Sequence, residues 1–223
     1  MSLRHLGIIA DGNRRWAKSQ GLPSIEGHKK GLEAIKKLVA AAGKTDIEYI
    51  TFYVFSTENW GRSKDEVSYI MKLAETRILK YAKELAENNA KLVILGSKKK
   101  VSPQLASLMK KAEDITADCT GITVGFCFNY GGEVEIADAA TIASEVEDEI
   151  TPETIRKHLY HPEIPDLDMV VRTSGEERIS GFMLWRASYA EFMFIEKYFP
   201  EMSGDDIKDI IKEYESRSRR FGK

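Results

Sequence analysis

The polar segment DGNRRW, residues 11–16, combines residue types that a site for an anionic ligand and a metal ion would need. Gly12 allows the backbone to approach a ligand closely, and Arg14 and Arg15 add positive charge. Asp11 could hold a magnesium ion that bridges to the ligand, because Mg²⁺ prefers one or two carboxylates together with substrate phosphates. The segment therefore predicts a diphosphate–magnesium site. A plain helix cap by Asp11 explains this segment equally well.

A second charged segment, RTSGEERIS, spans residues 172–180. Its two arginines, glycine and hydroxyl side chains suit a second anionic group held by bidentate hydrogen bonds. A solvated surface loop explains it less well, because Arg172 directly follows the apolar residues 169–171. The pattern favours a second anion-binding loop.

A third segment, FSTENWGR, spans residues 55–62 and mixes hydrogen-bonding, ionic and aromatic groups. Functional side chains concentrate on such loops, which makes Ser56, Asn59 and Arg62 candidates. Trp60 could bind a ligand or simply anchor the core.

Short β-rich runs alternate with amphipathic helical patterns along the chain, which predicts a single α/β domain with a mostly parallel central sheet flanked by helices. Ligands bind such sheets at the carboxyl ends of the strands, which singles out residues 11–15, 56–62, 129–132 and 172–180. The expected strands are 5–10, 47–55, 91–95, 122–128, 169–172, 182–185 and 191–195. The expected helices are 14–20, 27–44, 64–88, 102–119, 132–147, 152–159 and 203–219.

Several other function classes fit poorly. The net charge of −2 argues against a nucleic-acid partner. No GxxxxGK[ST], GxSxG or HExxH motif occurs. Asp205, Asp206 and Asp209 spell DDIKD, a motif of the all-helical trans-prenyl synthases, but acids in the first turn after a Ser203 cap explain it. Cys119 and Cys127 are expected to be buried apolar residues of a reduced protein.

Taken in order, these segments resemble blocks of the cis-prenyltransferases, the undecaprenyl diphosphate synthase family. The resemblance covers nearly the whole chain and implies one catalytic domain over residues 1–223, with an apolar tunnel between sheet and helices. It implies a magnesium-dependent transferase that condenses isopentenyl diphosphate with an allylic diphosphate to give a cis-polyprenyl diphosphate, a lipid carrier for cell-wall or glycan synthesis. The matching blocks are HLGIIADGNRRWAK, GHKKG, YVFSTENWGR, FNYGG, RTSGEERIS, LWRASYAE and RRFG.

The resemblance also implies roles for individual residues. Asp11 would hold Mg²⁺ and assist departure of the allylic diphosphate, and Glu191 would help to position the metal or the second substrate. Asn59, His28 or a diphosphate oxygen would accept the proton. The residues implied for substrate binding are Gly12, Asn13, Arg14, Arg15, Trp16, His28, Ser56, Trp60, Arg62, Arg172, Arg178 and Ser180.

Some positions depart from the family pattern. Ser24 stands where many members carry an arginine, and Ser174 where many carry a glycine. Val54, Phe126 and Phe128 are bulkier than the usual residues. If they face the tunnel they would shorten it, which favours a short or medium product.

Two rival functions fit the same segments. A non-catalytic partner subunit would lose the aspartate and arginines that this chain keeps. A phosphate-ester hydrolase would need a nucleophile or a multi-carboxylate metal cluster, for which only Asp11 offers itself.

The resemblance implies a homodimer in which Arg220-Phe221-Gly222 completes the partner's site. No signal peptide or membrane-spanning stretch is visible, so a cytoplasmic protein is expected. Its lipid product would give it a peripheral contact with the membrane.

Overall fold

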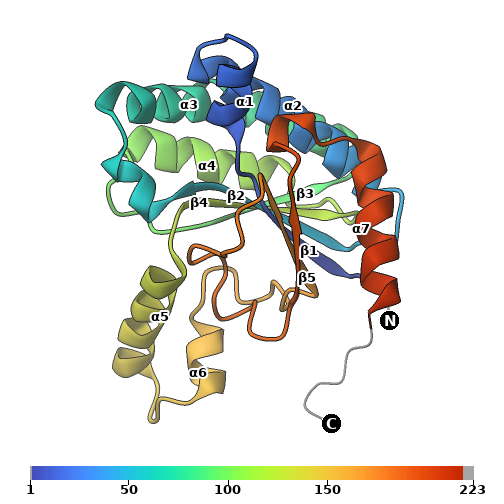
Figure 1. Cartoon of the computed structure of the whole chain (residues 1–223). Helices are drawn as coiled ribbons and strands as arrows, with labels where there is room; N and C mark the ends of the chain where they lie inside the picture. The colour runs from blue at the N-terminus through green and yellow to red at the C-terminus, as the bar shows by residue number, and fades with distance from the viewer. Residues whose placement is uncertain (1, 218–223) are drawn as a thin grey trace.

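The computed structural model describes residues 2–217 and is built on a six-stranded sheet (Figure 1). All the strand pairs are parallel, and the spatial order is β3-β4-β2-β1-β5-β6. This confirms the predicted α/β class. The strands are β1 (His5–Ile9), β2 (Tyr49–Ser56), β3 (Lys91–Leu95), β4 (Thr123–Tyr130), β5 (Met169–Thr173) and β6 (Glu191–Ile195).

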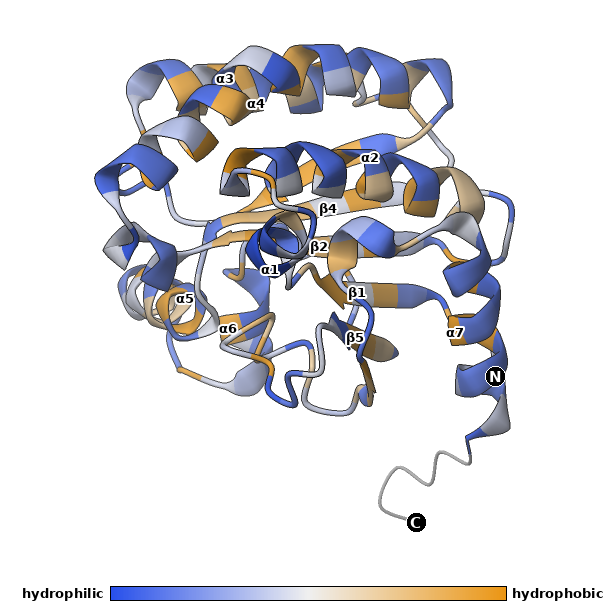
Figure 2. Cartoon of the chain, turned by 45° about the horizontal axis from the view of Figure 1, so that its top comes forward, coloured by the Kyte–Doolittle hydropathy of each residue, from blue (hydrophilic) through white to orange (hydrophobic). Residues whose placement is uncertain are grey.

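Helices cover both faces of the sheet, as Figure 1 shows: α1 to α4 and α7 pack on one side, and α5 and α6 lie on the other. On the second face of β1 and β5, apolar side chains of the segments that flank β5, such as Leu167, Phe182 and Met183, complete the cover, and every residue of these two strands is buried. Figure 2 shows the same division, with hydrophobic strands inside and helices striped between polar and apolar residues. The helices are α1 (Asn13–Ser19), α2 (Ser24–Ala42), α3 (Lys64–Glu87), α4 (Pro103–Ile115), α5 (Gly132–Val146), α6 (Pro152–Lys157) and α7 (Gly204–Ser216).

Alternate residues of the strands point to opposite faces of the sheet and contribute to two separate hydrophobic cores. Ile8 and Phe52 point towards α2, α3 and α7, whereas their neighbours Ile9 and Tyr53 pack with Phe182 on the other face. Among the described residues, no helix has the length and apolarity needed to cross a bilayer.

The predicted strand at residues 182–185 is wrong, because these residues form turns between β5 and β6. Phe182 and Met183 are fully buried, which explains the strand-like apolar pattern. Ser180, Gly181 and Met183 have φ angles of 49°, 76° and 42°, which no strand accommodates. Most other predicted elements occur with ends shifted by a few residues. The predicted helix 203–219 corresponds to α7, but its last two residues lie outside the described residues. Arg220-Phe221-Gly222, predicted to complete the partner's site, also lies outside them.

The strand order creates a switch point beside β1. β2 and the strands beyond it lie on one side of β1, and β5 and β6 lie on the other. The segments that leave the carboxyl ends of β1 and β5 therefore emerge side by side, where ligands bind in sheets of this type.

Two glycines allow α1 to sit directly on α2. A Cβ on Gly27 would lie 2.0 Å from the carbonyl oxygen of Asn13, and one on Gly31 would lie 2.4 Å from the Asn13 side-chain oxygen. The start of α1, which follows Asp11 and Gly12, is held in place by this contact.

We expect Gly27→Ala to lower the free energy of unfolding by about 1–3 kcal/mol, because the backbone of Asn13 must move to make room. Urea denaturation measures the change. Gly43→Ala is the control, because Gly43 has a helical φ of −64° and its Cβ would meet its nearest neighbour at 3.4 Å. Equal stability of Gly27→Ala and wild type would contradict the close packing.

The buried side chain of His5 on β1 makes two hydrogen bonds, one to the segment before β5 and one to β2. Its Nδ1 lies 2.9 Å from the carbonyl oxygen of Pro165, so Nδ1 must carry the proton, and Nε2 accepts a bond from the Thr51 hydroxyl at 2.8 Å. Burial lowers the pKa of His5 to about 4 from an ordinary 6.5, although the Pro165 carbonyl opposes this. The fold therefore requires neutral His5.

Lowering the pH should therefore destabilise the folded protein, because it favours protonated His5. Because the pKa of His5 is lower in the folded chain, the stability that neutral His5 provides is complete above pH 6.5 and is lost as the pH falls towards 4. Between about pH 7 and pH 5, we expect wild type to lose about 2 kcal/mol more than His5→Gln. Urea denaturation at both pH values measures the difference. Titration of the other histidines is common to both proteins, and parallel losses would refute the assignment to His5.

Candidate active site

An ion pair between Asp11 and Arg172 joins the segment that follows β1 to the carboxyl end of β5. Arg172 donates from Nη2 to Asp11 Oδ2 at 2.8 Å, and its side chain is only 5% exposed. Thr173 fixes the Asp11 backbone, because its hydroxyl accepts from the Asp11 N–H at 3.0 Å and donates to the Asp11 carbonyl at 2.6 Å. The two segments that the sequence singled out first therefore form one site.

Asp11 is held in its ionised form. Burial alone would raise the pKa of Asp11, but the hydrogen bond and charge of Arg172, together with Arg15, keep it below its ordinary value. Gly12 donates its N–H to Asp11 Oδ1 and has a φ of 99°, a conformation that favours glycine. Because α1 has only seven residues, the arginines supply most of the attraction for an anion here.

A second carboxylate, Glu176, holds two more arginines over the site. Arg15 donates to Glu176 Oε1 at 2.9 Å and stacks above the Tyr198 ring, 5.9 Å from its centroid. Arg178 pairs with the other oxygen of Glu176. Both arginine side chains remain partly exposed to solvent.

A third carboxylate, Glu66 at the start of α3, gathers the cations of the opposite rim. Arg62 lies 2.9 Å and Arg14 3.3 Å from its oxygens, and His28 Nε2 lies 3.5 Å away. Burial lowers the pKa of His28 despite the opposing charge of Glu66, which favours the neutral ring. Three elements, α1, α2 and the segment after β2, therefore meet on one side chain.

These groups surround a polar cleft of about 500 Å³ at the carboxyl end of the sheet. Among the residues that line the cleft, Arg172 Nε and Asn13 Oδ1 are buried without a hydrogen-bond partner. Ser174 Oγ, which lies next to Gly12, is also buried without one. The predicted site residues that line the cleft are Asp11, Gly12, Asn13, Arg14, Arg15, His28, Ser56, Asn59, Arg62, Arg172, Arg178 and Ser180.

The segment after β2 forms a short 3₁₀ helix, Thr57–Gly61, inside the cleft wall. Ser56 and Asn59 cap this helix reciprocally, and Asn59 Oδ1 accepts the Ser56 N–H at 3.2 Å. Trp60 does not line the cleft. It packs against Phe55 and donates Nε1–H to Asn129 at 2.7 Å, which is the core-anchor alternative.

One other predicted site residue and one predicted loop also lie outside the cleft. Trp16 is half-buried on α1 and is not among the residues that line it. Residues 129–132 span the end of β4 and the start of α5. Asn129 accepts a hydrogen bond from Trp60 and donates to the carbonyls of Ser97 and Lys99, so it supports neighbouring segments and does not line the cleft.

Glu191 is not brought to Asp11. It begins β6 opposite Met169, at the amino end of the sheet, and pairs with Arg217 at 3.1 Å. The described part of the chain contains no cluster of three or more His, Cys, Asp or Glu side chains that could bind a metal ion. Asp11 with the phosphates of a substrate fits the coordination that Mg²⁺ prefers, whereas Glu191 of the same chain lies at the other end of the sheet.

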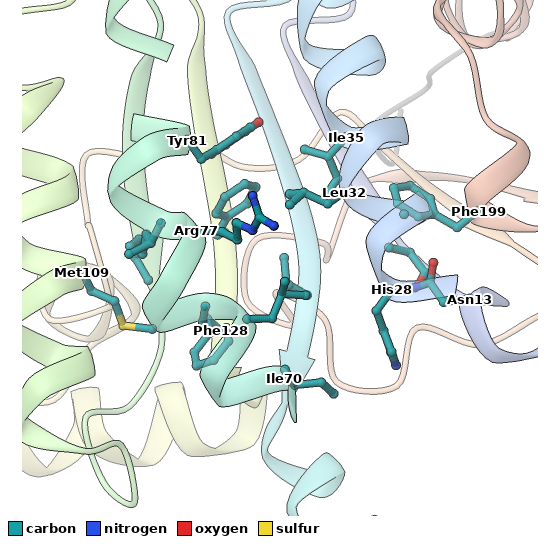
Figure 3. Close-up of a pocket in the computed structure, with 18 residues that line it drawn as sticks. Asn13, His28, Leu32, Ile35, Ile70, Arg77, Tyr81, Met109, Phe128 and Phe199 are labelled. Carbon is teal, nitrogen blue, oxygen red and sulfur yellow. The ribbon is translucent and has the colours of Figure 1, made fainter. Parts of the chain in front are cut away.

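An apolar channel of about 150 Å³ continues from the cleft between the sheet and helices α2 and α3. Ala10, Asn13, His28 and Val54 line both spaces, so the two are contiguous. Figure 3 shows His28 and Asn13 on one side of this pocket and Met109 and Phe128 on the other. The bulky residues that the sequence singled out, Val54, Phe126 and Phe128, all line the channel.

Glu66 and Glu176 are the residues that sequence reasoning missed as organisers of charge. Both lie inside or beside segments already selected for their arginines. The signal was the surplus of arginines itself, because several cations in one cleft require carboxylates to hold them apart.

Comparison with known proteins identifies one family over nearly the whole chain. The family model described as "Putative undecaprenyl diphosphate synthase" matches residues 9–222. An isoprenyl transferase of Neisseria meningitidis serogroup B is 41% identical over 99% of this chain and 89% of its own length. An isoprenyl transferase of Agrobacterium fabrum is 43% identical over 98% of this chain and 91% of its own.

Solved structures agree as well. Lavandulyl diphosphate synthase from Lavandula x intermedia, crystallised with dimethylallyl diphosphate, superposes with a TM-score of 0.94 at 32% identity. That alignment covers 100% of this chain and 99% of the other. A probable undecaprenyl diphosphate synthase from Campylobacter jejuni gives a TM-score of 0.86 at 32% identity, with complete coverage of both chains.

Ser174, which lies next to Gly12 beside the cleft, has a strained backbone. Its φ is 83°, and its hydroxyl is buried without a partner. We expect Ser174→Gly to stabilise the protein by about 1 kcal/mol, raising the melting temperature by about 2–4 °C in a thermal denaturation experiment. Ser68→Gly, on the exposed face of α3, is the control and should destabilise. A lower melting temperature for Ser174→Gly would mean that the hydroxyl contributes more than the strain costs.

Proposed function

The chain belongs to the undecaprenyl diphosphate synthase family of prenyltransferases, and on that premise we propose that it adds isopentenyl diphosphate to an allylic diphosphate such as farnesyl or geranyl diphosphate. The products would be a cis-polyprenyl diphosphate and inorganic diphosphate. The observation that carries this proposal is the continuity of an arginine-rich cleft with an apolar channel. One ligand with an anionic head and a hydrocarbon tail fits both spaces at once.

The two diphosphates would occupy different parts of the cleft. Arg172, Arg178 and Ser180 would hold the diphosphate of isopentenyl diphosphate, since they lie together at the carboxyl end of β5 and on the segment that follows it. The allylic diphosphate would bind near Gly12 and Asn13 at the channel mouth, so that its tail enters the channel. Arg14, Arg15 and Arg62 would add charge at the rim. Their carboxylate partners would be replaced by phosphate oxygens as the substrates bind.

Catalysis would depend mainly on charge and orientation. Positive groups fixed around the departing diphosphate stabilise the charge that develops there without reorganising. Holding two substrates in a reactive orientation contributes about 7–11 kcal/mol to the lowering of a barrier. Mg²⁺ held by Asp11 would offset the negative charge of the leaving diphosphate. Asp11 is ionised in advance, because Arg172 lowers its pKa.

The proton acceptor would lie at the junction of cleft and channel. Asn59 lines the cleft, but its amide oxygen already accepts the Ser56 N–H and a neutral amide is a poor base. His28 lines both spaces and its pKa is lowered, which keeps the ring neutral and able to accept a proton. His28 and a diphosphate oxygen are therefore the better candidates.

The channel supports a product of short or medium length. Its wall contains Phe126 stacked on Tyr81, with ring centroids 5.4 Å apart, and Phe128 stacked on Phe55. These rings occupy space that a longer hydrocarbon chain would need. The product would serve as a lipid carrier and would bring the enzyme to a membrane surface. The whole chain would act as one catalytic domain and assemble as a homodimer.

The rival functions have less support. A non-catalytic partner subunit would have no need to keep Asp11, Arg15 and Arg172 in contact at the cleft. A hydrolase with a multi-carboxylate metal centre would need a cluster that residues 2–217 do not form.

The test is incorporation of radiolabelled isopentenyl diphosphate into extractable lipid, with farnesyl or geranyl diphosphate and Mg²⁺. We expect incorporation by wild type and a loss of about 10²–10³-fold in kcat for Asp11→Ala. Asp205→Ala, in the exposed DDIKD sequence of α7, is the matched control and should retain activity. Folded wild-type protein that incorporates no label with either starter would overturn the proposal in favour of the partner subunit. Chromatography of the lipid would measure its length.

A further inference from the structure

A groove of about 420 Å³ runs along the outer surface between α2 and α3, away from the arginine-rich cleft. Its apolar lining comes mainly from Leu32, Tyr69, Leu73 and Tyr81. Five cationic side chains border it against two acidic ones. The cationic residues are Lys29, Lys36, Lys72, Arg77 and Lys80, and the acidic ones are Glu33 and Glu84.

Much of this positive charge is not neutralised locally. Lys36 pairs with Glu84, and Lys29 with Glu26. Within residues 2–217, no ion pair or hydrogen bond is found for the side chains of Lys72, Arg77 and Lys80, all of which are exposed. The chain as a whole carries a net charge of −2, so this excess of positive charge is a local property of the α2–α3 face.

Only a thin wall separates the groove from the apolar channel. Leu32, Leu73, Arg77 and Tyr81 line both spaces, and Figure 3 shows Leu32, Arg77 and Tyr81 around the channel. The buried hydroxyl of Tyr81 has no hydrogen-bond partner in this wall. The exposed side chain of Arg77, which lines both spaces, has no hydrogen bond or ion pair within residues 2–217.

We propose that the α2–α3 face docks the protein on an anionic lipid bilayer, with the groove lying against the headgroups. Cationic side chains around an apolar surface match the negative surface and hydrocarbon interior of such a bilayer. The substrate diphosphates do not explain these charges, because the arginines of the cleft already serve them from the other end of the channel. The proposal rests on the proposed function for its purpose, since docking at this face places the channel that would hold the lipid product next to the bilayer.

Sedimentation with vesicles tests the surface directly. Full-length protein is mixed with vesicles of phosphatidylcholine, with or without phosphatidylglycerol, and the bound fraction is measured. We expect binding only to vesicles that contain phosphatidylglycerol, and weaker binding as salt increases. Lys72→Glu/Lys80→Glu should bind at least about tenfold more weakly, because each basic residue near an anionic surface adds to the attraction.

The control is Lys98→Glu/Lys212→Glu, which changes the net charge equally at exposed positions outside the groove. It should bind like wild type. Equal loss in both double variants would attribute binding to overall charge and overturn the proposal, as would wild-type binding that ignores phosphatidylglycerol or no binding at all. Circular dichroism confirms folding of each variant.

The incorporation assay, performed in detergent without vesicles, separates this proposal from the proposed function. Lys72 and Lys80 do not line the channel or the cleft, so Lys72→Glu/Lys80→Glu should incorporate label like wild type. A protein that binds vesicles through this face but incorporates no label would refute the proposed function alone. A protein that incorporates label but does not bind the vesicles would refute the docking surface alone.

Discussion

The repulsion between cations crowded into one cleft is the constraint on which the rest of the site depends. A buried arginine is stable only with a partner, and Arg172 at 5% exposure has Asp11. Glu66 and Glu176 do the same for the cations of the two rims. Three carboxylates against five arginines reduce the repulsion between the cations and leave the cleft net positive before any ligand arrives. Each carboxylate also joins segments that are distant in sequence, so the same ion pairs that offset the positive charge also set the shape of the cleft. The arginines that share these carboxylates are Arg14, Arg15, Arg62, Arg172 and Arg178.

The sheet makes this concentration of charge possible. The parallel order places the carboxyl ends of β1, β2 and β5 at one edge, where each strand can deliver one polar segment. The strands behind these segments are buried on both faces and leave little freedom to the residues that follow them. Close contacts at Gly27 and Gly31 then fix the start of α1. A rigid apolar body therefore holds a set of charges that would separate on a flexible one.

Much of this arrangement could be predicted because local chemistry and global fold agree. Asp11 and Arg172 each follow an apolar run and precede a glycine, and the rule for parallel sheets brings such segments together. The strand prediction failed where apolar residues are buried without belonging to a strand or helix. Residues 182–185 look like a strand because Phe182 and Met183 are apolar, but they are buried within turns. Glu191 was assigned by resemblance, and the strand register places it at the amino end of β6, far along the sheet from Asp11 of the same chain. Trp60 packs against Phe55 and bonds Asn129, which no local pattern distinguishes from ligand binding.

The seam between cleft and channel has a consequence for divergence. Only four residues among those described, Ala10, Asn13, His28 and Val54, line both spaces. Substitutions deeper in the channel, for example at Ile94 or Met109, alter the room for hydrocarbon without touching a charged group. Under the proposed function, the residues that would set product size and those that would set reactivity are therefore nearly separate sets. Such a division would let substitutions in the channel change the chain length while the ionic chemistry of the cleft stays the same.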